Sequence, residues 1–479
     1  MTSTSRLPRR AWTAAVATAL LAACASPQVQ PPTAPWSGAQ LGLNASASTP
    51  VAANWWTTWG DAKLQSLMAQ ALQDHPGMQQ AAARVRRAQA ASQLAGAADL
   101  PQVGLGADFS RQRYSANGLF PKPIAGNTWN NDTLQVSLGW TPDLWGEHAA
   151  ALAAAVGQTR AAEAEAAMAS QMLASQILRA SIGLARLLAQ SETSTQLIAL
   201  RDTAQTLVRQ RQAAGLDTGI DRAQSETSLA ELQTQHHALQ EQIALARHQL
   251  AVLCGLPPQA LQDHVPRLED FALPAMPAQL GADLLGRRPD VVAARWRAEA
   301  AQQQIHVART QFYPSVSLGA FAGYNALGTE HLLDAGSRQY GIVPALRLPL
   351  FEGGRLKAQL AGREAERDAA VAQYNQAVLD AVREAADAIR SSAGAAQQVA
   401  DQSRALAGAQ QAFALAQQRE QAGLGNRLTL LNAQAALLAQ QRAAIDLQAR
   451  QLDVRVQLVR ALGGGWSAEP LTAQTTARR

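Results

Sequence analysis

Residues 134–146 read LQVSLGWTPDLWG, and this stretch decides the fold. From Leu134 to Trp140, apolar side chains alternate with small or polar ones, which predicts a β-strand with one apolar face. After Gly146, a helical pattern rich in alanine, glutamine and leucine runs without proline to about residue 213. At a rise of 1.5 Å per residue, this pattern predicts a helix roughly 100 Å long.

The alternating pattern recurs upstream and downstream, so the sequence predicts four strands in two pairs. A long polar loop joins the two strands of each pair, at 111–131 and at 325–339. The four strands are expected at about 101–112, 132–142, 313–325 and 339–350.

The remaining helices follow from the same kind of pattern. A helix with a kink at Pro76 is predicted over 61–98, because apolar residues there recur at helical spacing. A second long helix is predicted from about 355 to 421. A return helix of about half the length follows each long one, at about 221–253 and 429–462.

The body of the chain is one unit written twice. His75-Pro76 matches Arg288-Pro289, and Leu100-Pro101 matches Tyr313-Pro314, both at an offset of 213 positions. Three later landmarks recur in the same order, so we predict an internal duplication rather than a solenoid array. Each unit reads helix, strand, strand, long helix, return helix, and the fold class is mostly α with a smaller β part. The two structural repeats are expected at 54–265 and 266–466.

The N-terminus has the features of an export signal. Three arginines precede a short apolar stretch at 11–21, which is too short to span a bilayer. It ends in Leu21-Ala22-Ala23-Cys24, which resembles a bacterial lipobox; the alternative is an ordinary signal peptide with a chance cysteine. We predict a signal peptide at 1–23, lipidation of Cys24 by palmitate, a lipidated tether at 24–53 and a flexible tail at 467–479.

Charge and composition exclude several classes of protein. The net charge is +5, but without the three leader arginines 38 basic residues face 36 acidic ones. No basic block remains, so we expect no nucleic-acid partner. Two cysteines exclude a disulfide framework, and Cys254 is expected to be a small buried residue. The low charged fraction of 16% and the many alanines predict long helices that approach closely.

No set of residues predicts catalysis. Ser/His/Asp and Cys/His arrangements do not stand out, and the glycine pairs lack the Lys-Ser/Thr of a phosphate loop. His236, His237 and His248 share a predicted helix, but their spacing does not match helical zinc motifs. We therefore expect no enzyme, no cofactor and no metal site.

The four strands have two explanations. The chain has no apolar run that we expect to form a transmembrane helix, and alternating strands cross a bilayer only in a closed barrel. Four strands are too few for a barrel of one chain, so several chains would share it. The alternative is a small soluble sheet under a helical bundle. Patterning alone leaves both open.

Three blocks of sequence resemble the TolC-like outer-membrane factors, and within them the NodT-type lipoproteins of multidrug efflux systems. The first is Trp55-Trp56 with Trp59 and the helix that follows. The most specific is the central block of Arg287-Arg288-Pro289-Asp290-Val291 followed by 307–315. The third is the closing segment 461–466, Ala-Leu-Gly-Gly-Gly-Trp. The resemblance covers essentially everything after the tether.

This resemblance implies a homotrimer with a twelve-stranded β-barrel in outer-membrane lipid and a long periplasmic α-helical barrel. It further implies an inner-membrane RND-type pump and a periplasmic adaptor (membrane fusion) protein as partners. The family's Ala-Gly-Leu turns between paired helices dock the adaptor, a role that the resemblance assigns to Gly215, Leu216, Gly423 and Leu424. The residues expected at the periplasmic aperture are Asp217, Asp221, Arg427, Thr429 and Asn432.

The chain departs from the family pattern at the second turn, where Thr429 and Asn432 stand in place of frequent aspartates. Polar hydrogen bonds, with Arg427, are therefore expected to hold the closed end there. The function implied is an exit duct for drugs or other small compounds. The alternatives are a type I protein secretion duct and a non-conducting periplasmic coiled-coil scaffold.

Overall fold

The computed structural model describes residues 33–36, 40, 51–52, 54–271 and 284–466. The predicted signal peptide, Cys24, most of the tether and the C-terminal tail lie outside the described residues. The chain divides into two compact units. The sheet unit contains Arg86–Ala161 and Ala294–Gln373, and the helical unit contains Trp36–Val85, Ala162–Ala293 and Tyr374–Arg479. Each unit takes residues from both sequence repeats.

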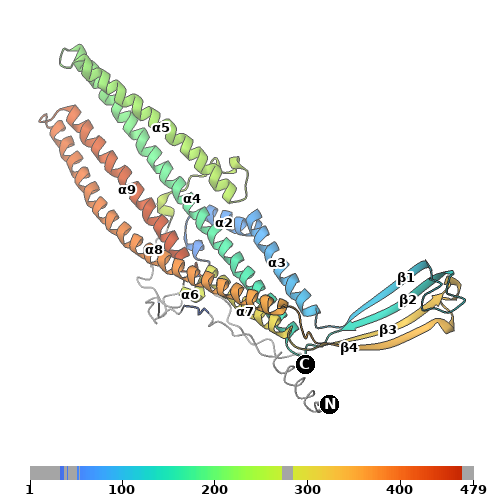
Figure 1. Ribbon diagram of the computed structural model, residues 1–479. Helices are drawn as coiled ribbons and strands as arrows, with labels where there is room; N and C mark the ends of the chain where they lie inside the picture. Colours follow the sequence, from blue (N-terminus) through green and yellow to red (C-terminus); the bar gives the residue numbers. More distant parts are fainter. Residues whose placement is uncertain (1–32, 37–39, 41–50, 53, 272–283, 467–479) are drawn as a thin grey trace, which may run out of the picture. The chain divides into compact units, whose positions relative to one another are not determined.

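The helices follow the predicted order (Figure 1). The two long helices are equally long, 67 residues each, and so are the two return helices, at 35 residues each. Both long helices have the predicted bounds. Neither contains a proline that would interrupt it. The helices are α2 (Ala62–Asp74), α3 (Pro76–Ala97), α4 (Glu147–Ala213), α5 (Gly219–Leu253), α6 (Leu284–Arg287), α7 (Pro289–Thr310), α8 (Arg355–Gln421) and α9 (Arg427–Ala461), with short 3₁₀ turns η2 (Trp55–Thr58), η3 (Pro258–Leu261), η4 (Leu268–Asp270), η5 (Thr329–His331) and η6 (Ala335–Ser337).

The predicted helix 61–98 is two helices. His75 adopts an extended backbone, with φ −61° and ψ 133°, and ends α2 before Pro76 starts α3. A residue before proline avoids the helical region, so the expected kink becomes a complete break. Asp61 caps α2 by accepting a hydrogen bond from the Leu64 N–H at 2.8 Å.

The four strands form one antiparallel sheet in the order β1-β2-β3-β4 (Figure 1). β4 ends at Arg347 instead of continuing to 350, because its partner strand begins at Ser315 and Pro349 offers no N–H. β2 begins at Thr128, opposite Arg113, so the first loop is shorter than predicted. The strands are β1 (Gln102–Arg113), β2 (Thr128–Trp140), β3 (Ser315–Leu327) and β4 (Arg338–Arg347).

The sheet has one apolar and one polar face. Leu105 pairs with Val136, which is level with Ala322 and, beyond it, Tyr340. The neighbouring row, from the other face, runs through Gly104, Ser137, Phe321 and Gly341. This period-two alternation is the one that the sequence predicted.

The core of the helical unit lies where α2, α4, α5 and α9 meet. Trp55 and Trp59 contact edge to face, with ring centroids 6.1 Å apart, and both are buried. The larger side chains of this core are fully or almost fully enclosed: Leu64, Met68, Ile177, Leu178, Leu250, Leu452 and Val456.

Two ion pairs join α4 to α9 across the two repeats. Arg179 pairs with Asp453, and Arg186 pairs with Asp446 at 3.1 Å. On α4 the second arginine follows the first by seven residues, about two helical turns, and on α9 the second aspartate precedes the first by seven, because the two helices are antiparallel. The pairs therefore fix the register of α4 against α9.

The sequence was expected to contain no helix long and apolar enough to span a membrane, and judged by length and composition this expectation was wrong. α4 is long and apolar enough to do so, although 56% of its most apolar stretch is buried inside the structure. The cause is the run of alanines and leucines that packs in the core of the helical unit. Such a mostly buried helix is also found in the cores of soluble proteins, so this feature alone is weak evidence of a membrane span.

Candidate functional site

The first helix tip is a glycine turn between α4 and α5. The Gly215 N–H donates to the Gln212 carbonyl at 2.9 Å, and the Leu216 N–H donates to the Arg211 carbonyl at 2.8 Å. This pattern is a Schellman motif, which requires a left-handed residue, and Gly215 has φ +76°. The Ala-Gly-Leu segment therefore forms a turn between paired helices, as expected. Leu216 is 67% exposed.

An ion pair braces this turn. Arg211 donates to both carboxylate oxygens of Asp217, each at 2.9 Å. The hydrogen bond to Asp217 raises the pKa of Arg211, and the charges of Asp217 and Asp221 add to it. Such a bidentate pair holds Asp217 against the end of α4.

Asp221 belongs to a capping box at the start of α5. Its Oδ2 accepts hydrogen bonds from the Thr218 N–H at 2.8 Å and from the Thr218 hydroxyl at 2.6 Å. In return, the Asp221 N–H donates to Thr218 Oγ1 at 3.3 Å. The bonds from Thr218 lower the pKa of Asp221, so the carboxylate stays charged as it caps the helix.

The second tip, between α8 and α9, repeats the turn. Gly423 has φ +73°, and the Leu424 N–H donates to the Arg419 carbonyl at 2.8 Å. Leu424 is 72% exposed. The second Ala-Gly-Leu segment therefore forms the same kind of left-handed glycine turn.

The polar groups of the second tip differ from those of the first. Asn426 caps α9, because its Oδ1 accepts from the Thr429 N–H at 2.7 Å and from the Thr429 hydroxyl at 2.8 Å. Arg427 lies 3.3 Å from Glu420. Asn432 is exposed on α9. The predicted aperture residues at both tips are thus close to the turns, and their aperture role stays a prediction.

Sequence reasoning missed the residues that hold these turns. Arg211 and Glu420 were not singled out, although Arg211 lies four residues before Gly215 and Glu420 lies three residues before Gly423. Thr218 and Asn426 were missed too, although Thr-x-x-Asp at 218–221 is the signature of a capping box.

The remaining candidates lie elsewhere. Cys24 lies outside the described residues. Cys254 is buried and free, as predicted, and burial raises the pKa of its thiol to about 11. His236 contacts Ser194 Oγ at 3.2 Å and Gln240 at 3.3 Å. Over the described ranges, no three His, Cys, Asp or Glu side chains come together as a metal site would need.

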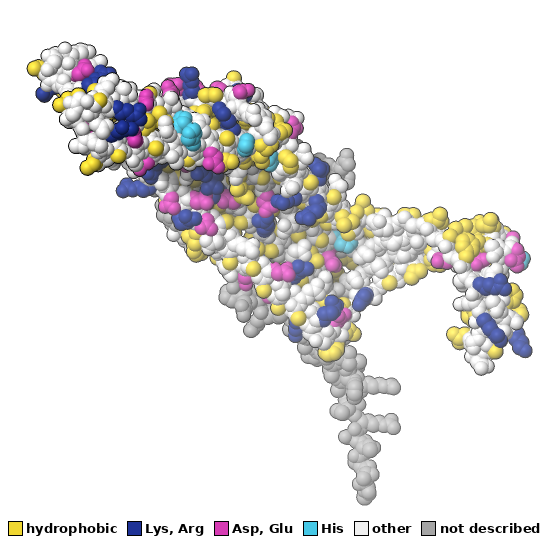
Figure 2. All heavy atoms as spheres, turned by 90° about the horizontal axis from the view of Figure 1, so that it is seen from above, with side chains coloured by type: hydrophobic (Ala, Val, Ile, Leu, Met, Phe, Trp, Pro, Cys, Tyr) yellow, Lys and Arg dark blue, Asp and Glu magenta, His cyan; other side chains and the backbone are white. Residues whose placement is uncertain are grey.

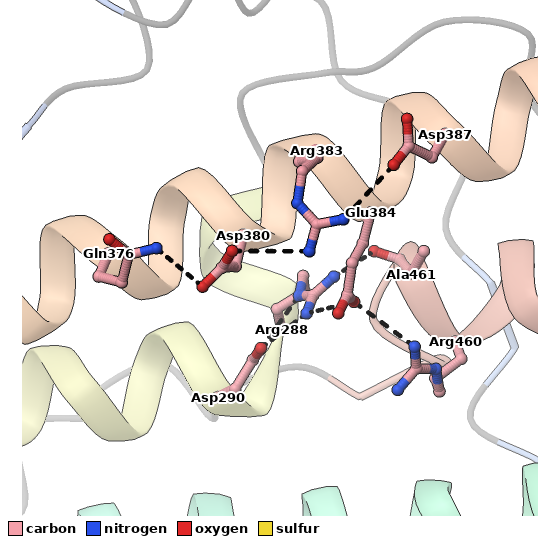
Figure 3. Close-up of polar contacts among 9 residues, drawn as sticks. All are labelled: Arg288, Asp290, Gln376, Asp380, Arg383, Glu384, Asp387, Arg460 and Ala461. Atoms are coloured by element: carbon pink, nitrogen blue, oxygen red, sulfur yellow. Dashed lines mark hydrogen bonds and ion pairs between the residues drawn. The ribbon is translucent and has the colours of Figure 1, made fainter.

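The central sequence block forms a buried ion cluster (Figure 3). Arg288 donates to both oxygens of Asp290, at 3.1 and 2.6 Å, and to Glu384 on α8 at 3.1 Å. Its Nη1 reaches the Ala461 carbonyl at the end of α9, at 3.3 Å. Burial would lower the pKa of Arg288, but the two carboxylates outweigh it and raise the pKa. Arg460 joins the cluster through Glu384, at 3.6 Å.

This cluster explains why two of the sequence blocks occur together. Asp290 is in the central block and Ala461 starts the closing block, and Arg288 bridges them. Gln171 on α4 strengthens the closing turn, because its Nε2 donates to the Gly463 carbonyl at 2.6 Å. The two blocks form one structural joint.

Known proteins similar to this chain share one theme. The family model described as outer membrane efflux protein matches residues 67–256 and 280–464. The multidrug resistance outer membrane protein MdtP of Escherichia coli is 33% identical over 439 residues, which is 88% of each chain. The fusaric acid resistance protein FusA of Burkholderia cepacia is 37% identical over 322 residues, 66% of this chain and 60% of FusA.

Solved structures show the same likeness. The outer membrane protein VceC of Vibrio cholerae is 37% identical and has a TM-score of 0.79, covering 87% of this chain and 99% of VceC. The CmeC outer membrane channel of Campylobacter jejuni has a TM-score of 0.81 at 18% identity, a likeness of fold.

Proposed function

The chain belongs to the outer membrane efflux protein family and is the outer-membrane channel of a tripartite efflux system, and on this premise we propose its assembly and cargo. Three copies form a homotrimer, whose sheets close a twelve-stranded barrel and whose helices form the periplasmic tunnel. An inner-membrane RND-type pump delivers drugs or other small compounds through a periplasmic adaptor. The resistance functions in the names of MdtP and FusA support this class of cargo.

The observation that carries the proposal is the open sheet. In the part of the chain that the structure describes, β1 and β4 each pair with one strand, so each has a free edge. Val103 and Leu105 on β1 are 68% and 73% exposed, and Tyr340 and Ile342 on β4 are 85% and 74% exposed. A sheet with free edges and a bare apolar face is stable neither in water nor in lipid. Closure with the sheets of two further copies pairs the edges and turns the apolar face toward lipid.

The helix tips are the proposed contacts with the adaptor. Leu216 and Leu424 are apolar side chains exposed at hydrogen-bonded glycine turns, where a partner can contact them. Gly215 and Gly423 fix those turns. The aperture is proposed to be lined by Asp217, Asp221, Arg427, Thr429 and Asn432, and Cys24 is proposed to carry the lipid.

Planar-bilayer recording on the purified chain tests the duct. A trimer by native mass spectrometry that conducts ions supports the proposal. A stable trimer that never conducts, even with the tips loosened, would favour a scaffold instead. Susceptibility of a deletion strain to a panel of compounds, compared with its secretion of proteins, separates drug efflux from protein secretion.

A pair of tip variants tests adaptor docking. Leu216→Asp combined with Leu424→Asp should abolish drug resistance in cells and leave trimer conductance intact, because charge replaces the apolar contact. Leu333→Asp is the matched control, since Leu333 is equally exposed, at 71%, in the β3–β4 loop. Equal resistance in the tip variant and the control would remove the tips from the docking surface.

A further inference from the structure

The two edge strands carry arginines at the loop end of the sheet. Arg111 and Arg113 close β1, and Arg338 opens β4. All three are exposed, and within the described residues their side chains make no hydrogen bond or ion pair. Figure 2 shows Lys and Arg side chains gathered at this end of the sheet.

These arginines lie on the apolar face. Arg111 and Arg113 follow Val103, Leu105 and Phe109 at steps of two, and alternate residues of a strand share a face. On β4, Arg338 precedes Tyr340 and Ile342 at the same step. The row from Leu105 through Val136 and Ala322 to Tyr340 places both sets on one face of the sheet.

Both strands have the same order of side chains from the loop end inward. β1 presents Arg113 and Arg111, then Phe109, then aliphatic residues, and β4 presents Arg338, then Tyr340, then Ile342. Along each strand taken by itself, this order of basic, aromatic and aliphatic residues matches the headgroup, interface and hydrocarbon layers of a bilayer.

The acidic residues near this end already have partners. Asp132, on the same face, is buried and accepts a hydrogen bond from Thr329 at 2.7 Å. Asp334 lies 2.9 Å from His331 Nδ1 in the β3–β4 loop, and Glu330 lies 4.0 Å from the same ring. The arginines therefore lack an internal counter-ion among the described residues.

Resting on the proposed trimer, we propose that these arginines bind the phosphate groups of a phosphorylated glycolipid in the outer leaflet. Closing the barrel pairs β1 of one copy with β4 of the next, because those are the free edges. Each seam then presents Arg111 and Arg113 of one copy beside β4 of its neighbour, which carries Arg338. The guanidinium fork matches phosphate oxygens, and the adjacent apolar band accommodates the acyl chains.

Native mass spectrometry of the intact trimer tests this site with purified lipid A as the probe. The unsubstituted trimer should retain bisphosphorylated lipid A in preference to its enzymatically dephosphorylated form and to phosphatidylethanolamine. Replacing all three residues, Arg111→Gln, Arg113→Gln and Arg338→Gln, should weaken retention roughly tenfold or more. Arg347→Gln is the matched control, since Arg347 is an exposed arginine on the opposite face at the other end of β4.

The outcomes separate the lipid site from the trimer. A spectrum without trimer would overturn the proposed assembly and this site with it. A trimer that retains phosphorylated and dephosphorylated lipid A equally would overturn the site alone, and this comparison needs no variant. Equal losses in the triple variant and in Arg347→Gln would also overturn it.

Discussion

His75 and Arg288 occupy matching places in the two halves of the duplicated chain, and they have different roles. Each precedes the proline that starts a helix, so the backbone device is shared. Among the described residues, His75 Nδ1 accepts just one hydrogen bond, from the Gly77 N–H two residues away, at 3.0 Å. Arg288 is buried and joins α7, α8 and α9 through two carboxylates and a carbonyl. Duplication kept the turn and left the side chain free to diverge.

The two helix tips teach the same lesson. Gly215 and Gly423 adopt the same left-handed geometry. The caps beside them differ, because Thr218 and Asp221 form a charged capping box and Asn426 forms a neutral cap. At both matched positions the two halves of the chain share the backbone geometry and differ in the polar side chains.

The largest effect is expected at the position where the halves differ most. Arg288→Gln should lower the free energy of unfolding by about 2 to 3 kcal/mol, since Asp290 loses its guanidinium partner and Glu384 keeps only Arg460, at 3.6 Å. The loss is less than for a fully buried pair, because the Asp290 and Glu384 side chains remain 31% exposed. Thermal unfolding followed by circular dichroism measures it. His75→Gln, the matched change, should cost under about 0.5 kcal/mol, and equal costs would contradict the divergence.

Replacing the turn glycines should affect both tips alike. Gly215→Val and Gly423→Val should each cost about 1 to 2 kcal/mol, because a branched side chain resists positive φ. No atom lies within 4 Å of an added Cβ at either site, so the cost is purely conformational. Gly394→Ala, inside α8 with the same open space, should instead stabilise by up to about 1 kcal/mol. Thermal midpoints of the three variants decide it, and a clear difference between the tips would show that their backbones are not equivalent.

Removing the caps should cost less. Thr218→Ala and Asn426→Ala should each lower stability by about 1 kcal/mol, since each leaves helix N–H groups without an acceptor. Hydrogen exchange in the first turns of α5 and α9 measures the local loss. Ser403→Ala, at an exposed position of α8 away from both caps, controls for the removal of a hydroxyl. If hydrogen exchange in the cap variants is no faster than in this control, the two residues do not cap their helices.

The smallest effect is expected in acid, which should destabilise the first helix tip more than the second. Bonds from Thr218 lower the pKa of Asp221 from its ordinary value of 3.8, so its stabilising contribution is full above that value and is lost as pH falls below it. The neutral cap at Asn426 has no such loss. Thermal midpoints measured down to about pH 3 should therefore fall less for Asp221→Asn than for the unsubstituted chain. Asn426→Asp should add a second acid-sensitive cap, and an unchanged profile in both variants would contradict this account.

Periodicity predicted the helices well and the polar joints poorly. The limits of α4 and α8 followed from proline-free helical patterns, and the glycine turns followed from Ala-Gly-Leu. The strands end a few residues away from their predicted ends, because a strand stops where the neighbouring strand no longer pairs with it. The Arg288 cluster could not be derived from local pattern, since Glu384 is 96 positions away and Ala461 is 173. The roles of the tips in docking and gating, and the lipidation of Cys24, stay predictions.

Equal helix lengths constrain how this protein can evolve. α4 and α8 have 67 residues each, and α5 and α9 have 35 each, so a deletion in one half alone would leave its tip short of the other. Arg179 and Arg186 meet their partners at a seven-residue step, which also fixes the helical phase. Insertions and deletions are therefore tolerated as matched pairs, in multiples of about seven residues. Lineages that lengthened or shortened this tunnel should carry coordinated indels in both halves of the gene.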